Sequence, residues 1–202
     1  MCIEEVGISA IQIFAILNPI SVIPIFLSLT EGRDEGEVRR IVGVVSVAIF
    51  IMMSIFSLAG ELILKLMGIS VRGLKIGGGA ILMVLAVDML QGMPRTKSVE
   101  EEELAIVPLS TPLLVGPGTM TTILLLSNKY SGTYGYLCSS LILTLASALV
   151  TVASYLILRN SGKLRKVLGV NGLRGLGRFM AIIVAATAAD MISSGILDFI
   201  KS

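Results

Sequence analysis

The chain has 202 residues, 54% of them hydrophobic, and a mean hydropathy of +0.92. This composition excludes an ordinary soluble domain and predicts an all-α integral membrane protein. Basic and acidic residues nearly balance, 16 against 14, so the net charge of +2 does not indicate a nucleic-acid partner. There is no histidine, and Cys2 and Cys138 lack the spacing of a metal site or a disulfide framework, so we expect no metal and no cofactor.

Six apolar segments follow one another along the chain, and each is long enough to cross a bilayer as a helix. The connections between them are short and polar, including the basic stretch Arg159–Gly175, which leaves no room for a soluble domain. We therefore predict one membrane domain, residues 1–202, that crosses the plasma membrane of a prokaryote six times. The predicted transmembrane helices span roughly residues 6–29, 41–64, 71–92, 105–127, 134–158 and 176–200.

The first segment contains Asn18-Pro19 near its middle. Proline breaks a helix interior but suits the first position of a helix, and asparagine is a favoured N-cap. We therefore predict two half-helices, the second beginning at Pro19, with Ser21 in its first turn. A single Asn-Pro would more often only kink a membrane helix, because neighbouring hydroxyls restore the lost hydrogen bonds.

The fourth segment carries a related break, Gly116-Pro117-Gly118-Thr119, with Gly116 at the cap position and Thr119 matching Ser21. Two further matches link the halves of the chain. Arg72-Gly73-Leu74 and Asp88-Met89 recur, at one common offset, as Arg174-Gly175-Leu176 and Asp190-Met191. Two related breaks at matching positions favour a binding site over a pair of simple kinks.

The halves therefore read as two three-helix repeats, at about residues 6–92 and 105–200. Because three is odd, the second repeat must lie inverted in the membrane, and broken helices one and four in an inverted repeat are typical of a transporter core. Eleven of the 16 basic residues fall in the connections after the first, third and fifth helices. The positive-inside rule therefore predicts that both termini face outside.

The two breaks predict a substrate site inside the bilayer. Converging helix N-termini, with unpaired N–H groups and the positive ends of their dipoles, suit a carboxylate. Freed carbonyls and polar side chains could receive an ammonium group, and no charged residue lies near either break, so a small net-neutral solute fits. The candidate substrate-binding residues are Asn18, Pro19, Ile20, Ser21, Gly77, Gly78, Ser110, Thr111, Gly116, Pro117, Gly118, Thr119 and Thr122.

Two further features lie inside the predicted helices. The glycine run that contains Gly77 and Gly78 lacks the ending of a phosphate loop, so we expect it to allow close helix contact, with the broken first helix as one candidate neighbour. Asp88 and Asp190 are the acids well inside predicted helices. They are candidates for proton coupling, and a structural role is an equally good explanation.

These segments resemble the MarC family over essentially the whole chain. The resemblance rests on LNPISVIPIF (17–26), RGLKIGGGAILMVLAVDMLQG (72–92), AIVPLSTPLLVGPGTMTTIL (105–124) and GLRGLGRFMAIIVAATAADMISSGI (172–196). It implies a six-helix membrane protein that transports small neutral amino acids such as glycine and alanine, and that is distantly similar to the lysine-exporter group. The resemblance does not fix the direction of transport or the coupling ion.

The leading interpretation is thus a secondary transporter of small neutral amino acids that works by alternating access around the two breaks. A coupling proton or sodium ion and ion-free exchange remain options, and the oligomeric state is left open. A thiol-disulfide electron carrier could use the same architecture, but it needs paired cysteines at matching repeat positions, which Cys2 and Cys138 do not occupy. Export of another small solute is a further alternative. Without histidine or a nucleophile beside a base, we expect no enzymatic activity.

Overall fold

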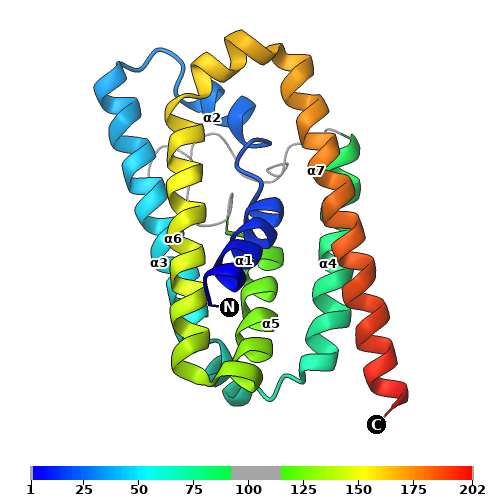
Figure 1. Ribbon diagram of the computed structural model, residues 1–202. Coiled ribbons are helices and arrows are strands. Elements are labelled where there is room, and N and C mark those ends of the chain that lie inside the picture. The colour runs from blue at the N-terminus through cyan, green and yellow to red at the C-terminus, as the bar shows by residue number, and fades with distance from the viewer. Residues whose placement is uncertain (1, 92–114, 202) are drawn as a thin grey trace.

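A computed structural model describes residues 2–91 and 115–201. The described residues form seven helices and no strand, which confirms the all-α fold class. In chain order the helices are α1 (Cys2–Leu17), α2 (Ile23–Leu29), α3 (Glu35–Met67), α4 (Val71–Gln91), α5 (Pro117–Tyr134), α6 (Tyr136–Arg159) and α7 (Ser161–Ile200) (Figure 1).

Helices α1 and α5 lie in the middle of the bundle (Figure 1). On one side of this central pair α3 packs against α6, and on the other side α4 packs against α7. The central helices contact each other, and both contact members of the two flanking pairs. The two central helices are therefore flanked on both sides by pairs of longer helices.

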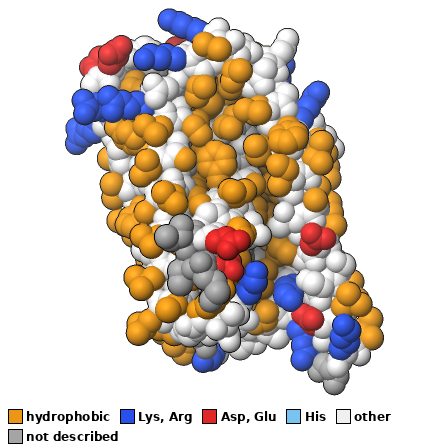
Figure 2. Space-filling view, in the orientation of Figure 1, with side chains coloured by type: hydrophobic (Ala, Val, Ile, Leu, Met, Phe, Trp, Pro, Cys, Tyr) orange, Lys and Arg blue, Asp and Glu red, His pale blue; other side chains and the backbone are white. Residues whose placement is uncertain are grey.

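Four of the described helices contain a stretch long and apolar enough to cross a membrane. These stretches are Glu35–Gly60, Val71–Gln91, Tyr136–Arg159 and Ser161–Ile200. Helices α1 and α2 are the two parts of the first predicted span, and α5 includes the second part of the fourth. Figure 2 shows hydrophobic side chains over the middle of the visible face, as expected of a surface that contacts lipid. The chain is a multi-pass helical membrane protein.

The basic stretch after α6 differs from the sequence prediction. We predicted a polar connection from Arg159 to Gly175, and this is wrong, because α7 begins at Ser161 and runs through it. Gly169 interrupts the helical geometry with φ 65° and ψ 175°, a left-handed conformation that glycine adopts without strain. Leu173 is buried, whereas Val167, Leu168 and Val170 of the same stretch are exposed.

Glycine residues bring α4 and α7 into close contact. A methyl group added at Gly79 would lie 2.7 Å from Ile192 Cγ1 and 2.9 Å from the Ala188 carbonyl oxygen. A methyl group at Gly195 would lie 2.7 Å from Ile76 Cγ1. The glycine run of α4 thus permits close helix packing as predicted, but against α7 and α5, not against the broken first helix.

An ion pair joins the same two helices near the end of α7. Lys75 Nζ lies 2.7 Å from Asp198 Oδ2, and the Arg72 guanidinium lies 5.8 Å from the centre of the Phe199 ring. Both contacts are at the opposite end of α7 from the α6–α7 junction. They fix the register of α4 against α7 at the side of the bundle where the chain ends (Figure 1).

Candidate functional site

The first break lies between α1 and α2. Helix α1 ends at Leu17, residues 18–22 form turns, and α2 begins at Ile23. The prediction of a break at Asn18-Pro19 is therefore confirmed, but the second half-helix does not begin at Pro19. The backbone N–H of Asn18 still donates to the Phe14 carbonyl, at 2.8 Å, so this residue closes the last turn of α1.

Asn18 has an unusual backbone conformation for a residue other than glycine. Its φ is +43°, in the left-handed region that asparagine tolerates better than most side chains. Its carbonyl oxygen accepts hydrogen bonds from the Ser21 N–H at 3.2 Å and the Ser21 hydroxyl at 2.9 Å. Asn18 is therefore a helix C-terminal residue and the start of a turn, and not the simple N-cap that we predicted.

The side-chain amide of Asn18 is almost wholly buried. The residue is 1% exposed, and its Oδ1 lies 3.4 Å from the Ser21 backbone nitrogen. Its Nδ2 has no hydrogen-bond partner among the described residues. A buried donor without a partner loses the free energy of a hydrogen bond to water, and such a group in a membrane helix break is a candidate ligand-binding atom.

The second break has the predicted geometry. Gly116 is the extended cap residue, with φ −83° and ψ 178°, and α5 begins with Pro117. Its carbonyl accepts the Met120 N–H at 3.1 Å, so the N–H groups of Gly118 and Thr119 stand in the first turn, where a helix provides no carbonyl acceptor. Thr119 is 2% exposed. Gly118 is also buried, whereas Gly116 is partly buried and Pro117 is exposed, so the first turn of α5 directs Gly118 and Thr119 toward the interior of the bundle.

The two breaks lie close to each other. A methyl group on Gly118 would lie 3.4 Å from Ile16 Cγ2, at the end of α1, and 2.5 Å from Leu82 Cδ2 of α4. Val115 belongs to the same buried apolar cluster as Leu17. The C-terminal end of α1 therefore meets the N-terminal end of α5, and the two dipole ends have opposite sign.

The pairing of helix ends differs from the sequence prediction in one respect. We predicted two helix N-termini that converge from opposite sides, at Pro19 and Pro117. Helix α2 has only seven residues and begins at Ile23, so its dipole is small. The helix ends that come together are the C-terminus of α1 and the N-terminus of α5.

The other predicted binding residues take different positions. Thr122 is buried and donates to the Gly118 carbonyl at 2.9 Å, which stabilises the first turn of α5. Gly78 is buried, and a methyl group there would collide with the Thr121 side chain, so α4 touches α5 just beyond the break. Gly77 is exposed and has open space around it.

At the first break, Pro19 is buried, and Ile20 and Ser21 are partly buried. Ser110 and Thr111 lie outside the described residues.

Along the chain, both candidate acids are far from the helix ends at the two breaks. Asp88 is partly buried near the end of α4, and Asp190 is exposed on α7. An exposed carboxylate within an apolar helix is costly in lipid, so Asp190 stays a candidate functional residue. The structure brings neither residue into an ion pair with a described basic side chain.

Sequence reasoning missed a set of buried hydroxyl contacts. Ser9 Oγ lies 3.0 Å from Tyr130 Oη, and both residues are buried between α1 and α5. Ser57 Oγ lies 3.4 Å from Ser147 Oγ, between α3 and α6. The two residues of each pair are far apart in sequence. The sequence therefore shows hydroxyl residues on the inner face of an apolar helix, but not which residues they contact.

Comparison with known proteins identifies the family. A model described as MarC family integral membrane protein matches residues 3–200. The chain belongs to the MarC family. A relative named UPF0056 membrane protein in Methanocaldococcus jannaschii is 33% identical over 193 residues, which cover 92% of each chain.

Bacterial relatives of this MarC family chain are similar over almost its full length. A UPF0056 membrane protein of Bacillus subtilis is 30% identical over 196 residues, with 92% of this chain and 91% of the relative covered. The UPF0056 inner membrane protein MarC of Escherichia coli is 28% identical over 214 residues, with 98% and 97% covered. No solved structure matches the chain.

Proposed function

We propose that this MarC family protein is a secondary transporter of small neutral amino acids of the glycine and alanine type. The observation that carries the proposal is the meeting of two helix ends inside the bundle, beside the buried and unpartnered amide of Asn18. Hydrogen-bond donors and helix dipole ends of opposite sign at one place suit a zwitterion.

The proposed binding mode assigns each end of the substrate to one helix end. The substrate carboxylate would accept from the Gly118 and Thr119 N–H groups at the positive end of α5 and from Asn18 Nδ2, which directly follows α1. The ammonium group would lie toward the C-terminal end of α1, where the dipole is negative. The close approach of Ile16 and Leu82 to Gly118 leaves little room, which favours a small side chain.

The residues at the breaks also favour a net-neutral substrate. Asn18, Ser21, Gly118, Thr119 and Thr122 are all uncharged. A lysine or glutamate substrate would have to bury its side-chain charge without a partner among these residues, at a cost of several kcal/mol.

The six-span inverted repeat is part of the proposal. It is supported by the packing of α3 against α6 and of α4 against α7, because these are the helices that the repeat makes equivalent. Contacts between equivalent elements are expected around a pseudo-two-fold axis in the membrane plane. Movement of one repeat against the other would expose the breaks alternately to the two sides of the membrane.

The proposed setting is the plasma membrane of a prokaryote with both termini outside. Proton coupling through Asp88 or Asp190, sodium coupling and ion-free exchange are each compatible with the proposal. The transport step breaks and forms no covalent bond, so no enzymatic activity and no cofactor are proposed.

A selectivity screen in liposomes tests this function. Purified protein would be reconstituted, and uptake of labelled glycine, alanine, lysine and glutamate would be compared with that of empty liposomes, with and without proton or sodium gradients. The proposal expects saturable uptake of glycine or alanine and none of lysine or glutamate. Preference for a charged amino acid, or no uptake of any neutral one by folded protein, would contradict it.

A further inference from the structure

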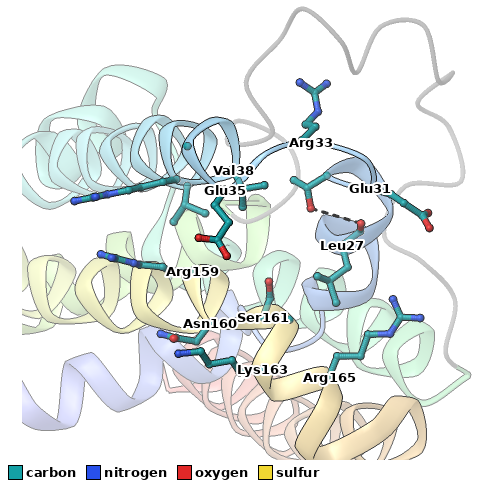
Figure 3. A pocket seen from close by; sticks show the side chains of 15 residues that line it. Leu27, Glu31, Arg33, Glu35, Val38, Arg159, Asn160, Ser161, Lys163 and Arg165 are labelled. Carbon is teal, nitrogen blue, oxygen red and sulfur yellow. Dashed lines mark hydrogen bonds between the residues drawn. The ribbon is translucent and has the colours of Figure 1, made fainter.

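A cavity of about 710 Å³ lies at the end of the bundle where the α2–α3 connection meets the α6–α7 junction (Figure 3). Five basic side chains line it, against the two acidic side chains of Glu31 and Glu35, which leaves an excess of three positive charges. The basic residues are Arg33, Arg39, Arg159, Lys163 and Arg165. They come from α3, from the connection before it, and from both sides of the α6–α7 junction.

Two of these five cations already have partners. Arg33 forms an ion pair with Glu37, at 2.6 Å, and Arg159 donates to the Tyr155 hydroxyl at 3.1 Å. Arg39, Lys163 and Arg165 have no ion-pair partner within the part of the chain that the structure describes. Three unpaired cations around one cavity make a site for an anion, and arginine favours phosphate because its planar fork matches phosphate oxygens.

The cavity also has an apolar side. Leu27, Val38 and Val42 line it together with the basic residues. A second cavity, of about 270 Å³, adjoins it, since Glu31 and Arg165 line both. Pro24, Val170 and Leu173 complete the second cavity. An apolar space next to a basic one fits an amphiphile better than a free inorganic ion.

We propose that this cavity binds a phosphate group carried by an anionic phospholipid. The phosphate would be bound by Arg39, Lys163 and Arg165 once these exposed side chains turn toward it, and the glycerol and upper acyl region would occupy the side lined by Pro24, Val170 and Leu173. Figure 3 shows the side chains of Glu35 and Ser161 between α3 and the α6–α7 junction, with the Lys163 and Arg165 side chains pointing away from each other. In the predicted orientation this end of the bundle faces the cytoplasmic leaflet, where anionic lipids attract basic pockets.

Matched variants of the full-length protein test the site. The pocket variant carries Arg39→Gln, Lys163→Gln and Arg165→Gln. The control variant carries Arg40→Gln, Lys166→Gln and Arg174→Gln, which remove the same charge from the same two helices but do not line the cavity. All six residues are exposed, so both variants are expected to fold, and circular dichroism and gel filtration would verify this.

The probes are short-chain phosphatidylglycerol, short-chain phosphatidylcholine and inorganic phosphate, each titrated into protein in a neutral detergent. Each basic residue near an anionic headgroup contributes about fivefold to affinity, so the pocket variant should bind phosphatidylglycerol about a hundredfold more weakly. The control variant should bind it nearly as the wild type does, and phosphatidylcholine should bind poorly to all three proteins.

Two results would overturn the proposal: equal weakening in both variants, which would show only general surface charge, or no phosphatidylglycerol binding by folded wild type. Binding of inorganic phosphate as tight as that of phosphatidylglycerol, and lost in the pocket variant alone, would support the phosphate site and reject the lipid as its source.

Discussion

Tyr130 of α5 lies within hydrogen-bond distance of Ser9 of α1, with 3.0 Å between the two hydroxyl oxygens and both residues buried. One turn further along α5, Tyr134 donates to Glu5 Oε1 at 3.2 Å. These contacts join the two central helices at the end away from the breaks. The meeting of α1 and α5 at Gly118 therefore belongs to a pair of helices that is held along its length.

Replacing Tyr130 with phenylalanine should lower the free energy of unfolding by about 1 kcal/mol, because the Ser9 hydroxyl loses its buried partner. Thermal unfolding in detergent would measure the change. Tyr155→Phe is the matched control, since its hydroxyl meets the exposed Arg159, and a smaller effect is expected. In a double-mutant cycle, Ser9→Ala and Tyr130→Phe should be non-additive. Simple additivity would show that the hydrogen bond contributes nothing.

Gly78→Ala and Gly77→Ala should differ sharply although the residues are neighbours. A methyl group at Gly78 would collide with Thr121 and lie 3.2 Å from Met191 Cε, whereas one at Gly77 meets nothing within 4 Å. We expect Gly78→Ala to destabilise the protein by about 1–3 kcal/mol through overpacking, and Gly77→Ala to be nearly neutral. Adding Thr121→Ser to Gly78→Ala should restore part of the loss. Equal stability of the two single variants would contradict the described packing of α4 on α5.

Substitutions at Asn18 can separate backbone strain from a role of its amide in binding. Because φ is +43°, Asn18→Gly should keep the protein as stable as the wild type or make it more stable, whereas Asn18→Ala should destabilise it by about 1–2 kcal/mol. Both variants lose the amide donor, so both should lose substrate affinity. Full affinity in Asn18→Gly would show that the amide does not bind the substrate.

Single cysteines at opposite ends of the bundle test the predicted orientation. In a Cys2→Ala, Cys138→Ala background, Gly36→Cys should react with an impermeant thiol reagent only after the cells are opened, because the basic end is predicted to face the cytoplasm. Gly132→Cys, near the end of α5, should react in intact cells. The opposite pattern of labelling would show that the predicted orientation is wrong and would place the phosphate cavity at the outer leaflet.

The sequence predicted the second break more accurately than the first. Gly116-Pro117 begins α5 as expected, because a small cap residue and proline at the first position both favour a helix start. Asn18-Pro19 contains the same kind of signal, but Asn18 first closes the last turn of α1 and leaves turns up to Val22. Capping patterns therefore located the break, and tertiary contacts decided where the next helix begins.

For a similar reason, the sequence did not predict which helices pack against each other. The glycine run predicted a close helix contact but not α7 and α5 as its partners, and Ser9 and Tyr130 are 121 residues apart. The helical course of Arg159–Gly175 was concealed because its charges outnumber the few apolar residues, such as Leu173, that become buried. Local patterns show which faces are small or polar, and not which helix covers them.

The most direct test of the transport site is uptake of labelled glycine and alanine into liposomes by wild type, Asn18→Gly and Gly77→Ala. We expect saturable uptake by the wild type, nearly unchanged uptake by Gly77→Ala, and a loss of about tenfold or more in Asn18→Gly, because one buried hydrogen bond to a charged group is removed. Saturable uptake that is equal in all three proteins would contradict a substrate site at the meeting of α1 and α5.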